Sequence, residues 1–280
     1  MTTDERSVSI ATNATVLTIA GSDPSGGAGL QADLKAFQQL GTYGMAVVTL
    51  ATVQNTQGVE RVETLSAELV SQQIEAVLTD ITPRALKTGA LGNAEIVCAV
   101  SEALSDCSCP IVVDPVLVSK HGEKLADDDV ISAYRDHLLP KATIITPNRF
   151  EVEALLDTKL ETLQDAADAA HQLKSLGPRY VLVKAGQFED TQHHMFASPE
   201  EVIGLELGTL DSNDTHGAGC ALSATITARL ALTVSREVDN DVMKQAVHFA
   251  VAAVHHAIEF APKLGQGIGP VETRMLHIGS

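Results

Sequence analysis

The chain has 280 residues, of which 45% are hydrophobic and 20% charged, and its formal net charge is -17. This length and composition allow one large α/β domain or two small ones. The 19 lysines and arginines are dispersed along an acidic chain, so no useful basic patch can form, which excludes a nucleic acid or an anionic membrane as a partner.

The amino terminus and the cysteines favour a reducing compartment. The first residues are polar and acidic, with no basic segment followed by an apolar run, so we expect no signal peptide and interpret residues 1–14 as a flexible extension. No apolar run approaches the roughly 18 residues that would suggest a membrane span. The four cysteines have neither the spread of a disulfide scaffold nor the C-x-x-C spacing of a zinc site. We therefore expect a cytoplasmic protein.

Short β-branched runs alternate with longer amphipathic stretches, an order typical of βαβ units. In chain order, the expected elements are a strand at 16–20, a helix at 30–40, a strand at 46–50, helices at 67–78 and 94–104, a strand at 111–114, a helix at 130–138, a strand at 143–146, a helix at 163–176, a strand at 180–184, a hairpin within 194–207, and helices at 221–232 and 241–259. No linker or repeat divides the chain. We predict a single domain, residues 15–280, built as a three-layer α/β/α sandwich with a mostly parallel central sheet.

A glycine-rich turn, Gly21 to Gly29, follows the first expected strand, at the sheet edge where open α/β proteins bind ligands. It starts like a P-loop, but Gly27-Ala28 stands where lysine followed by serine or threonine should bind phosphate and magnesium. Asp23 breaks the dinucleotide pattern G-x-G-x-x-G. A plain β-to-α connection is the alternative, although four glycines in nine residues favour contact with a ligand.

Polar residues also lie at the ends of the later strands, and each has a purely structural interpretation beside the ligand-binding one. The carboxylate of Asp114 could either hold a hydrated magnesium ion through water or cap a helix or turn. Asn148 and Glu151 have the spacing of a helix capping box and fit a ligand site equally well. Lys184 would place a positive charge near a nucleotide, whereas a surface lysine with its stem packed on the protein is the default.

The stretch Asn213 to Cys220 is a glycine-rich turn that runs into a helical pattern. Glycines permit a positive φ and close approach of the backbone, and the free amides of a first helical turn bind anions. The turn therefore predicts a phosphate cradle, in which the helix dipole would favour the thiolate of Cys220. A capped loop with a buried, inert cysteine is the alternative. Among the histidines, His216 alone lies inside this turn, and the adjacent pairs at 193–194 and 255–256 do not have metal-site spacing.

The chain closely resembles the hydroxymethylpyrimidine and phosphomethylpyrimidine kinases of thiamine biosynthesis, which belong to the ribokinase-like superfamily. The motifs that carry the resemblance occur in the family's order, at 20–33, 114–116, 146–151, 183–186, 215–220 and 265–270. They cover nearly the whole chain after about the first 14 residues. So many ordered motifs make a coincidental match far less probable than for any single motif.

The resemblance implies a homodimer that uses ATP and Mg²⁺ to phosphorylate 4-amino-5-hydroxymethyl-2-methylpyrimidine and then its monophosphate. The residues implied to surround the pyrimidine are Gly21, Ala28, Asp33, Gln54, Ala90 and Val116. Asp114 and Glu151 would face the magnesium ion, and the nucleotide side would comprise Asn148, Lys184, Thr215 and His216. The implied anion hole consists of Gly217, Ala218, Gly219 and Cys220. Cys220 would also be the base, because related sugar and pyridoxal kinases have an aspartate at that place.

One departure from the family pattern bears on the substrate. After the strand at Leu86, the family usually has a methionine that packs on the pyrimidine, and this chain has Ala90. The wider pocket admits a larger ring, so a pyridoxal kinase of the same superfamily is the nearest alternative. A non-catalytic pyrimidine-binding regulator is a second alternative, against which the intact glycine turn, Asp114 and Glu151 argue. A thiol-redox protein is a weak third, because Cys220 has no resolving cysteine nearby in the sequence.

Overall fold

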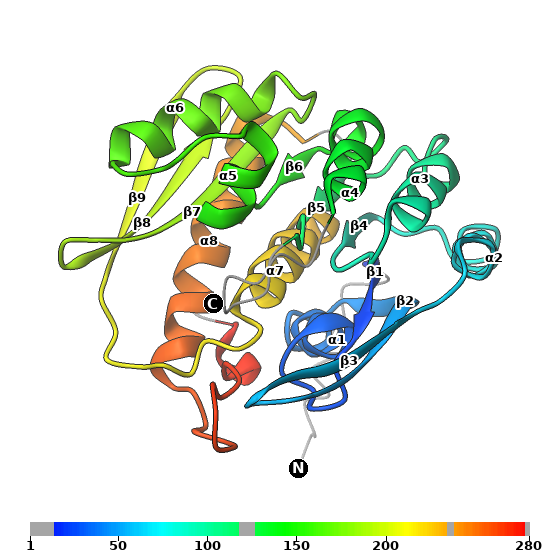
Figure 1. Cartoon of the computed structure of the whole chain (residues 1–280), viewed down its shortest axis with the longest axis horizontal. Helices are drawn as coiled ribbons and strands as arrows, with labels where there is room; N and C mark the ends of the chain where they lie inside the picture. Colours follow the sequence, from blue (N-terminus) through cyan, green and yellow to red (C-terminus); the bar gives the residue numbers. More distant parts are fainter. Residues whose placement is uncertain (1–13, 118–126, 234–237, 278–280) are drawn as a thin grey trace, which may run out of the picture.

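A sheet of nine strands runs through the middle of the protein in the part of the chain that the structure describes (Figure 1). This computed structural model describes residues 14–117, 127–233 and 238–277, so the extension expected at the amino terminus lies almost entirely outside the described residues. Across the sheet the strands follow the order β3-β2-β1-β4-β5-β6-β7-β8-β9. Their bounds are β1 Thr15–Ser22, β2 Tyr43–Asn55, β3 Gly58–Thr64, β4 Ala85–Thr88, β5 Ile111–Val113, β6 Ile144–Ile145, β7 Tyr180–Phe188, β8 Thr191–Ala197 and β9 Val202–Gly208.

The middle of the sheet is parallel and its edges are antiparallel. Strands β2, β1, β4, β5, β6 and β7 pair in parallel, which confirms the predicted sheet. Strands β8 and β9 form the expected antiparallel hairpin beside β7. Strand β3, which pairs antiparallel with β2, was not predicted. Its residues after Gly58 are all exposed, so it lacks the apolar alternation of a half-buried strand.

Helices cover both faces of the sheet and complete the predicted three layers (Figure 1). One hydrophobic core lies between the sheet and α2 to α6, and the other lies between the sheet and α1, α7 and α8. Side chains of β1 alternate between the two cores, with Leu17 and Ile19 in the first and Val16 in the second. The helices are α1 Gly29–Gln39, α2 Ala67–Leu78, α3 Ala94–Ala103, α4 Asp128–Ala133, α5 Arg149–Leu156, α6 Leu163–Lys174, α7 Ala218–Leu232 and α8 Asn240–Glu259.

The helix expected at 130–138 is shorter than predicted. Helix α4 ends at Ala133 and continues as a π-helical turn, Tyr134–Leu138, and a 3-10 turn, Leu139–Lys141. Pro140 lies in that last turn, where its missing amide cannot continue an α-helix. The turn directs the buried Tyr134 towards the sheet edge, where its hydroxyl lies 3.5 Å from the carbonyl oxygen of Gly89.

Strand order places a crevice beside β1. From β1 the chain first builds β2 and β3 on one side, and then crosses to β4 on the other side. Such a reversal separates the loops at the carboxyl ends of neighbouring strands and leaves room for a ligand between them. The glycine turn after β1 and the segment after β4 therefore border this crevice.

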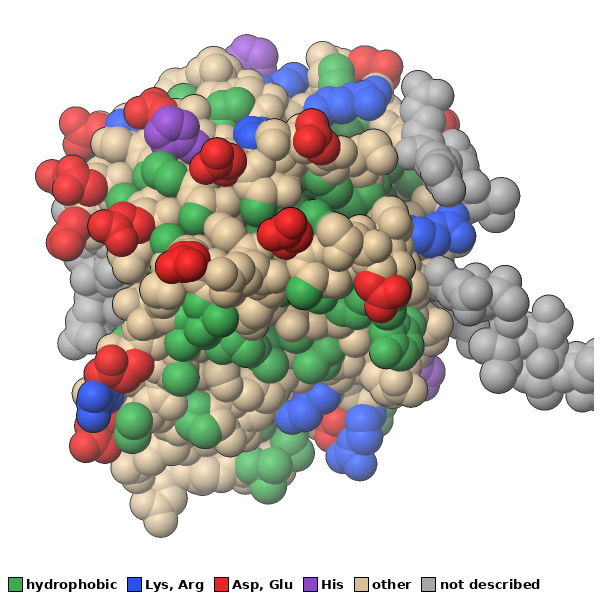
Figure 2. Space-filling view, turned by 90° about the vertical axis from the view of Figure 1, so that its right-hand side faces the viewer, with side chains coloured by type: hydrophobic (Ala, Val, Ile, Leu, Met, Phe, Trp, Pro, Cys, Tyr) green, Lys and Arg blue, Asp and Glu red, His purple; other side chains and the backbone are tan. Residues whose placement is uncertain are grey.

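The surface agrees with the acidic composition. Figure 2, which views the side of the molecule carrying α2 and α3, shows acidic side chains spread over this face and no continuous basic surface. Among the described residues, no helix is both long enough and apolar enough to cross a membrane.

A loop at residues 265–269 ties the β2–β3 hairpin to the turn before α7. The amides of Ile268 and Gly267 donate to the carbonyl and hydroxyl oxygens of Thr56, over 2.8 and 3.2 Å. At its other end, the amide of Gly269 donates to Asp214 Oδ1 over 2.9 Å. The loop thereby fixes the hairpin relative to the start of α7.

Gly267→Ala should loosen this hairpin, because a Cβ on Gly267 would overlap the carbonyl of Thr56. Loss of two hydrogen bonds, at about 1 kcal/mol each, predicts a roughly 30-fold faster cleavage by trypsin after the exposed Arg61 in β3. Limited proteolysis followed by mass spectrometry measures the rate. Gly208→Ala is the matched control, since a Cβ there meets no atom within 4 Å. Equal cleavage of both variants and the wild type would show that the loop does not hold the hairpin.

Candidate active site

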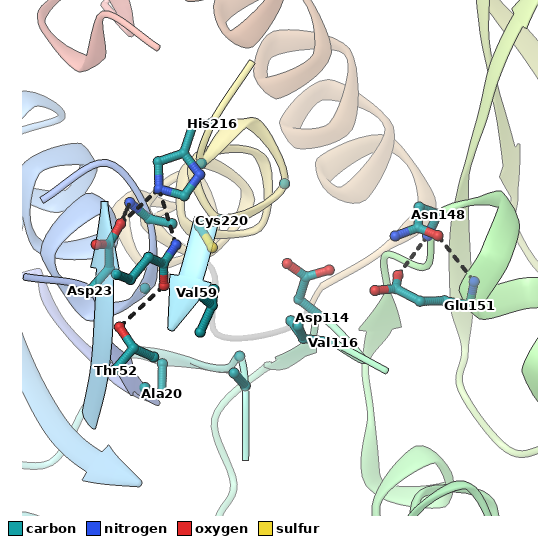
Figure 3. Close-up of a pocket in the computed structure, with 18 of the residues that line it drawn as sticks. Ala20, Asp23, Thr52, Val59, Asp114, Val116, Asn148, Glu151, His216 and Cys220 are labelled. Atoms are coloured by element: carbon teal, nitrogen blue, oxygen red, sulfur yellow. Dashed lines mark hydrogen bonds and ion pairs between the residues drawn. The ribbon is translucent and has the colours of Figure 1, made fainter. Parts of the chain in front are cut away.

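A cavity of about 740 Å³ lies at the carboxyl edge of the sheet (Figure 3). The carboxyl halves of β1, β2 and β7, the β2–β3 hairpin and the segments after β1, β4, β5 and β6 line it together with the start of α7, so motifs far apart in the sequence meet there. The predicted site residues on its wall are Gly21, Ala28, Gln54, Ala90, Asp114, Val116, Asn148, Glu151, Lys184, His216, Gly217, Gly219 and Cys220. Three predicted residues, Asp33, Thr215 and Ala218, are not on this wall.

A second cavity, of about 330 Å³, adjoins the first and shares Lys184, Gln187 and Gly219 with it. Thr215 and Ala218 lie on its wall, which also includes residues of β8, β9 and α8. The two cavities thus form two compartments that meet at Lys184 and the first turn of α7. The contribution of β8 and α8 was not predicted, because the apolar and histidine residues of these elements have the pattern of ordinary core or surface residues.

Two glycine turns pack directly against each other at the start of α7. Gly217 is the N-cap of this helix and has a φ of 80°, a left-handed conformation that favours glycine. A Cβ on Gly217 would overlap the carbonyl oxygen of Gly27, so the close approach also requires glycine. Gly219 and Cys220 follow in the first helical turn, whose amides have no acceptor within the helix. The turn therefore presents an anion-binding helix start to both cavities.

Asp114 and Lys184 form a partly buried ion pair in the wall of the cavity. Lys184 Nζ donates to Asp114 Oδ1 over 2.9 Å, and the side chain of Asp114 is 3% exposed. The hydroxyls of Thr146 and Ser223 donate to the two oxygens of the same carboxylate, over 3.1 and 3.3 Å. A Cβ at Gly219 would lie 3.3 Å from Lys184 Nζ. The lysine is thus a buried cation beside the anion-binding turn, and the surface-lysine alternative is wrong.

Asn148 and Glu151 form a capping box at the start of α5 and also line the cavity. Asn148 Oδ1 accepts from the amide of Glu151 over 3.0 Å, and Glu151 Oε2 accepts from the amide of Asn148 over 2.7 Å. Burial raises the pKa of Glu151 to about 8; the Lys184 charge opposes this shift and the Asp114 charge adds to it. The capping-box interpretation of this motif is therefore confirmed, and the cap places the carboxylate of Glu151 in the wall of the cavity that Asp114 also lines. The ligand-site interpretation stays a prediction.

The donor set fits a magnesium ion bound through few protein ligands. Asp114 and Glu151 are each 2% exposed, and burial together with the charge of Asp114 raises the pKa of Glu151. In the described part of the chain, no group of three or more histidine, cysteine or acidic residues could hold a metal ion. Mg²⁺ commonly uses one or two carboxylates and completes its shell with water and substrate phosphates. This pair of carboxylates meets that requirement, and a zinc-type site does not.

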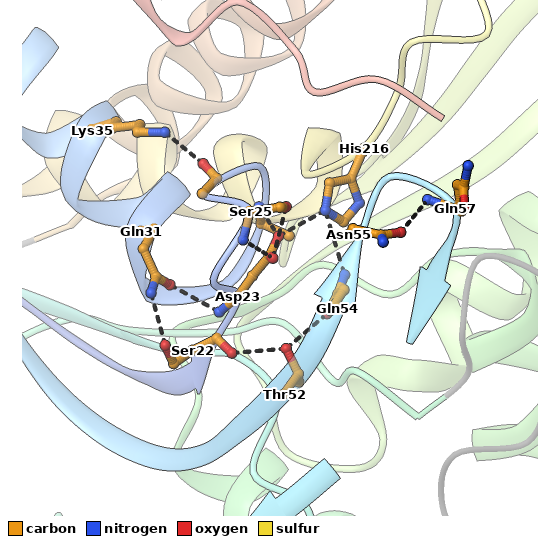
Figure 4. A network of polar contacts seen from close by, with 12 residues as sticks. Ser22, Asp23, Ser25, Gln31, Lys35, Thr52, Gln54, Asn55, Gln57 and His216 are labelled. Atoms are coloured by element: carbon orange, nitrogen blue, oxygen red, sulfur yellow. Dashed lines mark hydrogen bonds and ion pairs between the residues drawn. The ribbon is translucent and has the colours of Figure 1, made fainter. Parts of the chain in front are cut away.

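A polar network joins the first glycine turn to Gln54 (Figure 4). His216 Nε2 lies 2.8 Å from Asp23 Oδ2 and 3.4 Å from Gln54 Nε2. Thr52 Oγ1 donates to Gln54 Oε1 over 3.1 Å. Burial would raise the pKa of Asp23, but hydrogen bonds from His216, from Ser25 and from backbone amides lower it to about 2. Asp23 is therefore a carboxylate that holds His216 against Gln54.

This network corrects the expected place of His216. The resemblance put His216 on the nucleotide side, whereas the structure puts it beside Gln54 and the first glycine turn. The physical reason is the contact between the two glycine turns, which directs the histidine towards Asp23. The sequence analysis did not single out Asp23 as a site residue, although its position within a glycine turn is a usable signal.

Cys220 lies at the base of the cavity, partly buried, on the first turn of α7 (Figure 3). Burial raises the pKa of its thiol to about 11, although the positive charge of Lys87 acts in the opposite direction. The expectation that the helix start makes Cys220 a thiolate is therefore wrong for the free protein, because burial outweighs the helix start.

Asp33 is fully buried beneath the cavity and does not line it. Its Oδ1 accepts from Lys87 Nζ over 2.8 Å, and its Oδ2 accepts from the hydroxyl of Thr18 over 2.6 Å. Asp33 is therefore not placed to contact a pyrimidine, as was expected. It bonds instead to Lys87, which does line the cavity. Sequence reasoning missed Lys87, and a lysine inside the four-residue apolar strand β4 is the signal that was available.

Comparisons with known proteins agree on one family. The model of the phosphomethylpyrimidine kinase family matches residues 23–272. A hydroxymethylpyrimidine/phosphomethylpyrimidine kinase from Streptomyces coelicolor is 41% identical over 257 residues, which cover 92% of this chain and 93% of that protein. The structure of phosphomethylpyrimidine kinase from Clostridium difficile is 37% identical, covers 87% of this chain and 99% of its own, and has a TM-score of 0.75. The structure of pyridoxal kinase from Staphylococcus aureus in complex with ADP is 36% identical in sequence and has a TM-score of 0.86. The match covers 95% of this chain and 96% of the pyridoxal kinase chain.

The depressed pKa of Asp23 predicts a specific loss of stability in acid. A carboxyl whose pKa is lower in the folded state than in the unfolded state stabilises the fold at neutral pH and loses this effect as pH falls towards 2. The difference in unfolding free energy between wild type and Asp23→Asn should therefore shrink by roughly 2 kcal/mol between pH 6 and pH 2. Urea unfolding at each pH measures it. A difference that does not change with pH would contradict the assigned hydrogen bonds.

Gly217→Ala should disrupt the contact between the two glycine turns. Gly186 is the matched control, because it also has a positive φ, 94°, but a Cβ there meets no atom within 4 Å. Gly186→Ala should cost about 1 kcal/mol through backbone strain alone, and Gly217→Ala at least about 2 kcal/mol more through overlap with Gly27. Chemical denaturation of both variants measures these values. Equal costs would mean that the turns are not in close contact.

Proposed function

Because the chain belongs to the phosphomethylpyrimidine kinase family, we propose that it phosphorylates 4-amino-5-hydroxymethyl-2-methylpyrimidine and then its monophosphate with ATP. The product would be the pyrophosphate used in thiamine assembly. The observation that carries the proposal is the meeting of the anion-binding turn, the Asp114–Lys184 pair and Gln54 in one cavity that opens into a second. Phosphoryl transfer requires such positioning and charge compensation more than covalent catalysis.

The acceptor would lie against Gln54, between the two glycine turns. A side-chain amide presents one donor and one acceptor on the same edge, which matches a ring nitrogen beside an amino group. The hydroxyl of Thr52, which donates to the amide oxygen over 3.1 Å, holds this amide in place. The apolar walls for the ring would come from Val116 and Ala90, with the backbone of Gly21 and Ala28 closing the site.

In the first reaction, Cys220 would act as the base. The proton of the hydroxymethyl group moves to the sulfur, the acceptor oxygen forms a bond to the γ-phosphorus, and the bond from that phosphorus to the β-phosphate oxygen breaks to release ADP. The base gains one proton and the acceptor loses one, so the step balances. The thiol must first lose its own proton in a cavity that disfavours the thiolate.

Lys184 and the amides of the second glycine turn would compensate the charge of the transferred group. Lys184 carries its charge at the junction of the two cavities, where a phosphate chain would pass from one to the other. Asp114 and Glu151 would hold Mg²⁺, which when bound neutralises phosphate charge. The base and ribose of ATP would occupy the second cavity, beside Thr215 and Ala218.

The second reaction has a different requirement. Its acceptor is a phosphate oxygen, and a phosphate monoester with a second pKa of about 6 is already ionised at neutral pH. It therefore needs no base. Cys220 should matter much more for the first reaction than for the second.

A pyridoxal kinase activity is the second candidate, and Ala90 is the observation that favours it. Ala90 lines the cavity and its small side chain leaves room opposite Gln54 for a larger ring. The high structural similarity to a pyridoxal kinase agrees with this candidate. Both substrates present a hydroxymethyl group, so the same chemistry would serve either.

The proposal also places the protein in the cytoplasm as a homodimer. Cys98, Cys107, Cys109 and Cys220 are all free thiols, which is typical of a reducing compartment. Exposed valines on the β2–β3 hairpin, Val53, Val59 and Val62, are 45–51% exposed and offer an apolar surface for a second subunit.

Cys220→Ala should separate the two reactions. We expect turnover of the hydroxymethylpyrimidine to fall at least about 100-fold, while turnover of its monophosphate changes less than about tenfold. Mass spectrometry of the products formed with ATP and Mg²⁺ measures both. Cys220→Ser controls for size, since a serine hydroxyl is no better a base at neutral pH. A wild-type rate in the first reaction would remove Cys220 as the base, and no phosphorylated product from the wild type would refute the proposed function.

Ala90→Met should shift selectivity towards the pyrimidine. Filling the space opposite Gln54 should raise the ratio of kcat/KM for the hydroxymethylpyrimidine to kcat/KM for pyridoxal by about tenfold, as expected for a few added methylene-sized groups. Ala252→Met is the control, because Ala252 is an exposed residue of α8 that lines neither cavity. An unchanged ratio in Ala90→Met would mean that this position does not contact the acceptor ring.

A further inference from the structure

Lys87 is a buried charge to which the reaction described above assigns no part. It is the third residue of β4 and exposes none of its side chain, yet it belongs to the lining of the larger cavity. Its ammonium group donates to Asp33, which also accepts from Thr18 on the neighbouring strand. A buried ion pair is seldom needed for stability, because apolar residues of similar volume often stabilise a core as well or better. The pair therefore requires a reason other than folding.

The topology directs Lys87 towards the start of α7. Successive side chains of a strand alternate between faces, so Lys87 points to the same side as Ala85. Ala85 packs in the same hydrophobic core as Ala221 and Ala224 of α7. Lys87 lies one pleat closer to the carboxyl edge of the sheet, and hence beneath the first turn of α7. Cys220 belongs to that turn.

The position of the ammonium group agrees with this placement. A Cβ at Gly89 would lie 3.6 Å from Lys87 Nζ, and Gly89 lines the cavity together with Cys220. Lys87 therefore ends in the wall of the cavity that Cys220 also lines, and its ammonium group bonds there to Asp33 of α1.

The charges around Cys220 have opposite effects on its thiol. Burial raises its pKa, the Lys87 charge lowers it, and the charges of Asp33 and Asp114 raise it. The amide of Gly29 on α1 lowers it through a hydrogen bond. Burial lowers the pKa of Lys87, but the charge of Asp33 and, after it, the charge of Cys220 raise it. The charge of Cys220 also contributes, more weakly, to the raised pKa of Lys184, so two cations favour the thiolate, and Lys87 is the one whose effect on the thiol is larger.

We propose that Lys87 is a positioning residue that stabilises the thiolate of Cys220, and that Asp33 is the anion that shares the charge of Lys87 while the thiol is protonated. When the thiol ionises, its proton passes to solvent water, and Lys87 becomes the counter-ion of the sulfur without losing its own proton. The acceptor's hydroxyl proton then moves to the sulfur, and Lys87 returns to Asp33 alone. Only the role of the thiolate as a base rests on the proposed function, whereas the electrostatic coupling does not.

Two variants of the full-length protein should shift the ionisation of Cys220 in opposite directions. In Asp33→Asn/Lys87→Gln, amides replace both charges, no unpaired charge is left, and the midpoint of Cys220 ionisation should rise by about one pH unit or more. In Asp33→Asn alone, an anion near the thiol is removed while Lys87 stays, so the midpoint should fall below that of the wild type.

The midpoint is measured as the pH dependence of alkylation of Cys220 by iodoacetamide, quantified by peptide mass spectrometry. The exposed Cys98 serves as an internal control in each sample. Circular dichroism selects folded protein for comparison. A folded double variant with the wild-type midpoint would overturn the proposal. If the double variant does not fold, a midpoint in Asp33→Asn at or above that of the wild type overturns it in the same way.

Activity separates this inference from the proposed function. Shifted midpoints in a protein without kinase activity would support the coupling and refute the base role. Normal kinase activity with unshifted midpoints would refute the part assigned to Lys87 and leave the proposed function standing. In the active protein, the double variant should lose about tenfold in turnover of the hydroxymethylpyrimidine at pH 7.5, with rescue at higher pH.

Discussion

The contact between the two glycine turns is the constraint on which the site depends. Gly217 can approach the carbonyl of Gly27 only because it has no Cβ and adopts a left-handed backbone conformation with a φ of 80°. This approach brings the start of α7 to the end of β1, and with it Cys220 and the free amides of the first helical turn. It also turns His216 towards Asp23 and Gln54. One backbone contact therefore places both the anion-binding turn and the proposed acceptor site.

Buried charges around this contact determine what chemistry the cavity supports. Lys87 and Lys184 are paired with Asp33 and Asp114, and Glu151 stands beside the second pair with a raised pKa. A triphosphate chain brings more negative charge into such a cavity than one Mg²⁺ offsets, so the lysines would compensate the remainder. The lysines favour anions, including a thiolate, while the carboxylates hold a cation. The arrangement thus suits transfer of a charged group between two bound molecules.

Most of the fold and much of the site could be predicted from local patterns. The alternation of strands and helices predicted the parallel sheet. Asp114 and Asn148 were predicted as site residues because each follows an expected strand, and Lys184 because it ends one, although β7 continues to Phe188. Contacts between residues far apart in the sequence could not be predicted in this way. His216 and Asp23 are 193 positions apart, so no local pattern shows that they bond. The burial of Asp33 and the effect of burial on Cys220 depend on the packing of α1 against α7, which sequence spacing does not encode.

A crystal structure of the protein with a non-hydrolysable ATP analogue, Mg²⁺ and the hydroxymethylpyrimidine would test the central claim most directly. The account predicts the adenosine in the smaller cavity, the terminal phosphate against the amides of Gly219 and Cys220, and the hydroxymethyl oxygen between that phosphate and the sulfur of Cys220. It also predicts the pyrimidine edge on Gln54. A pyrimidine bound away from Gln54, or a phosphate chain that does not reach the start of α7, would contradict it.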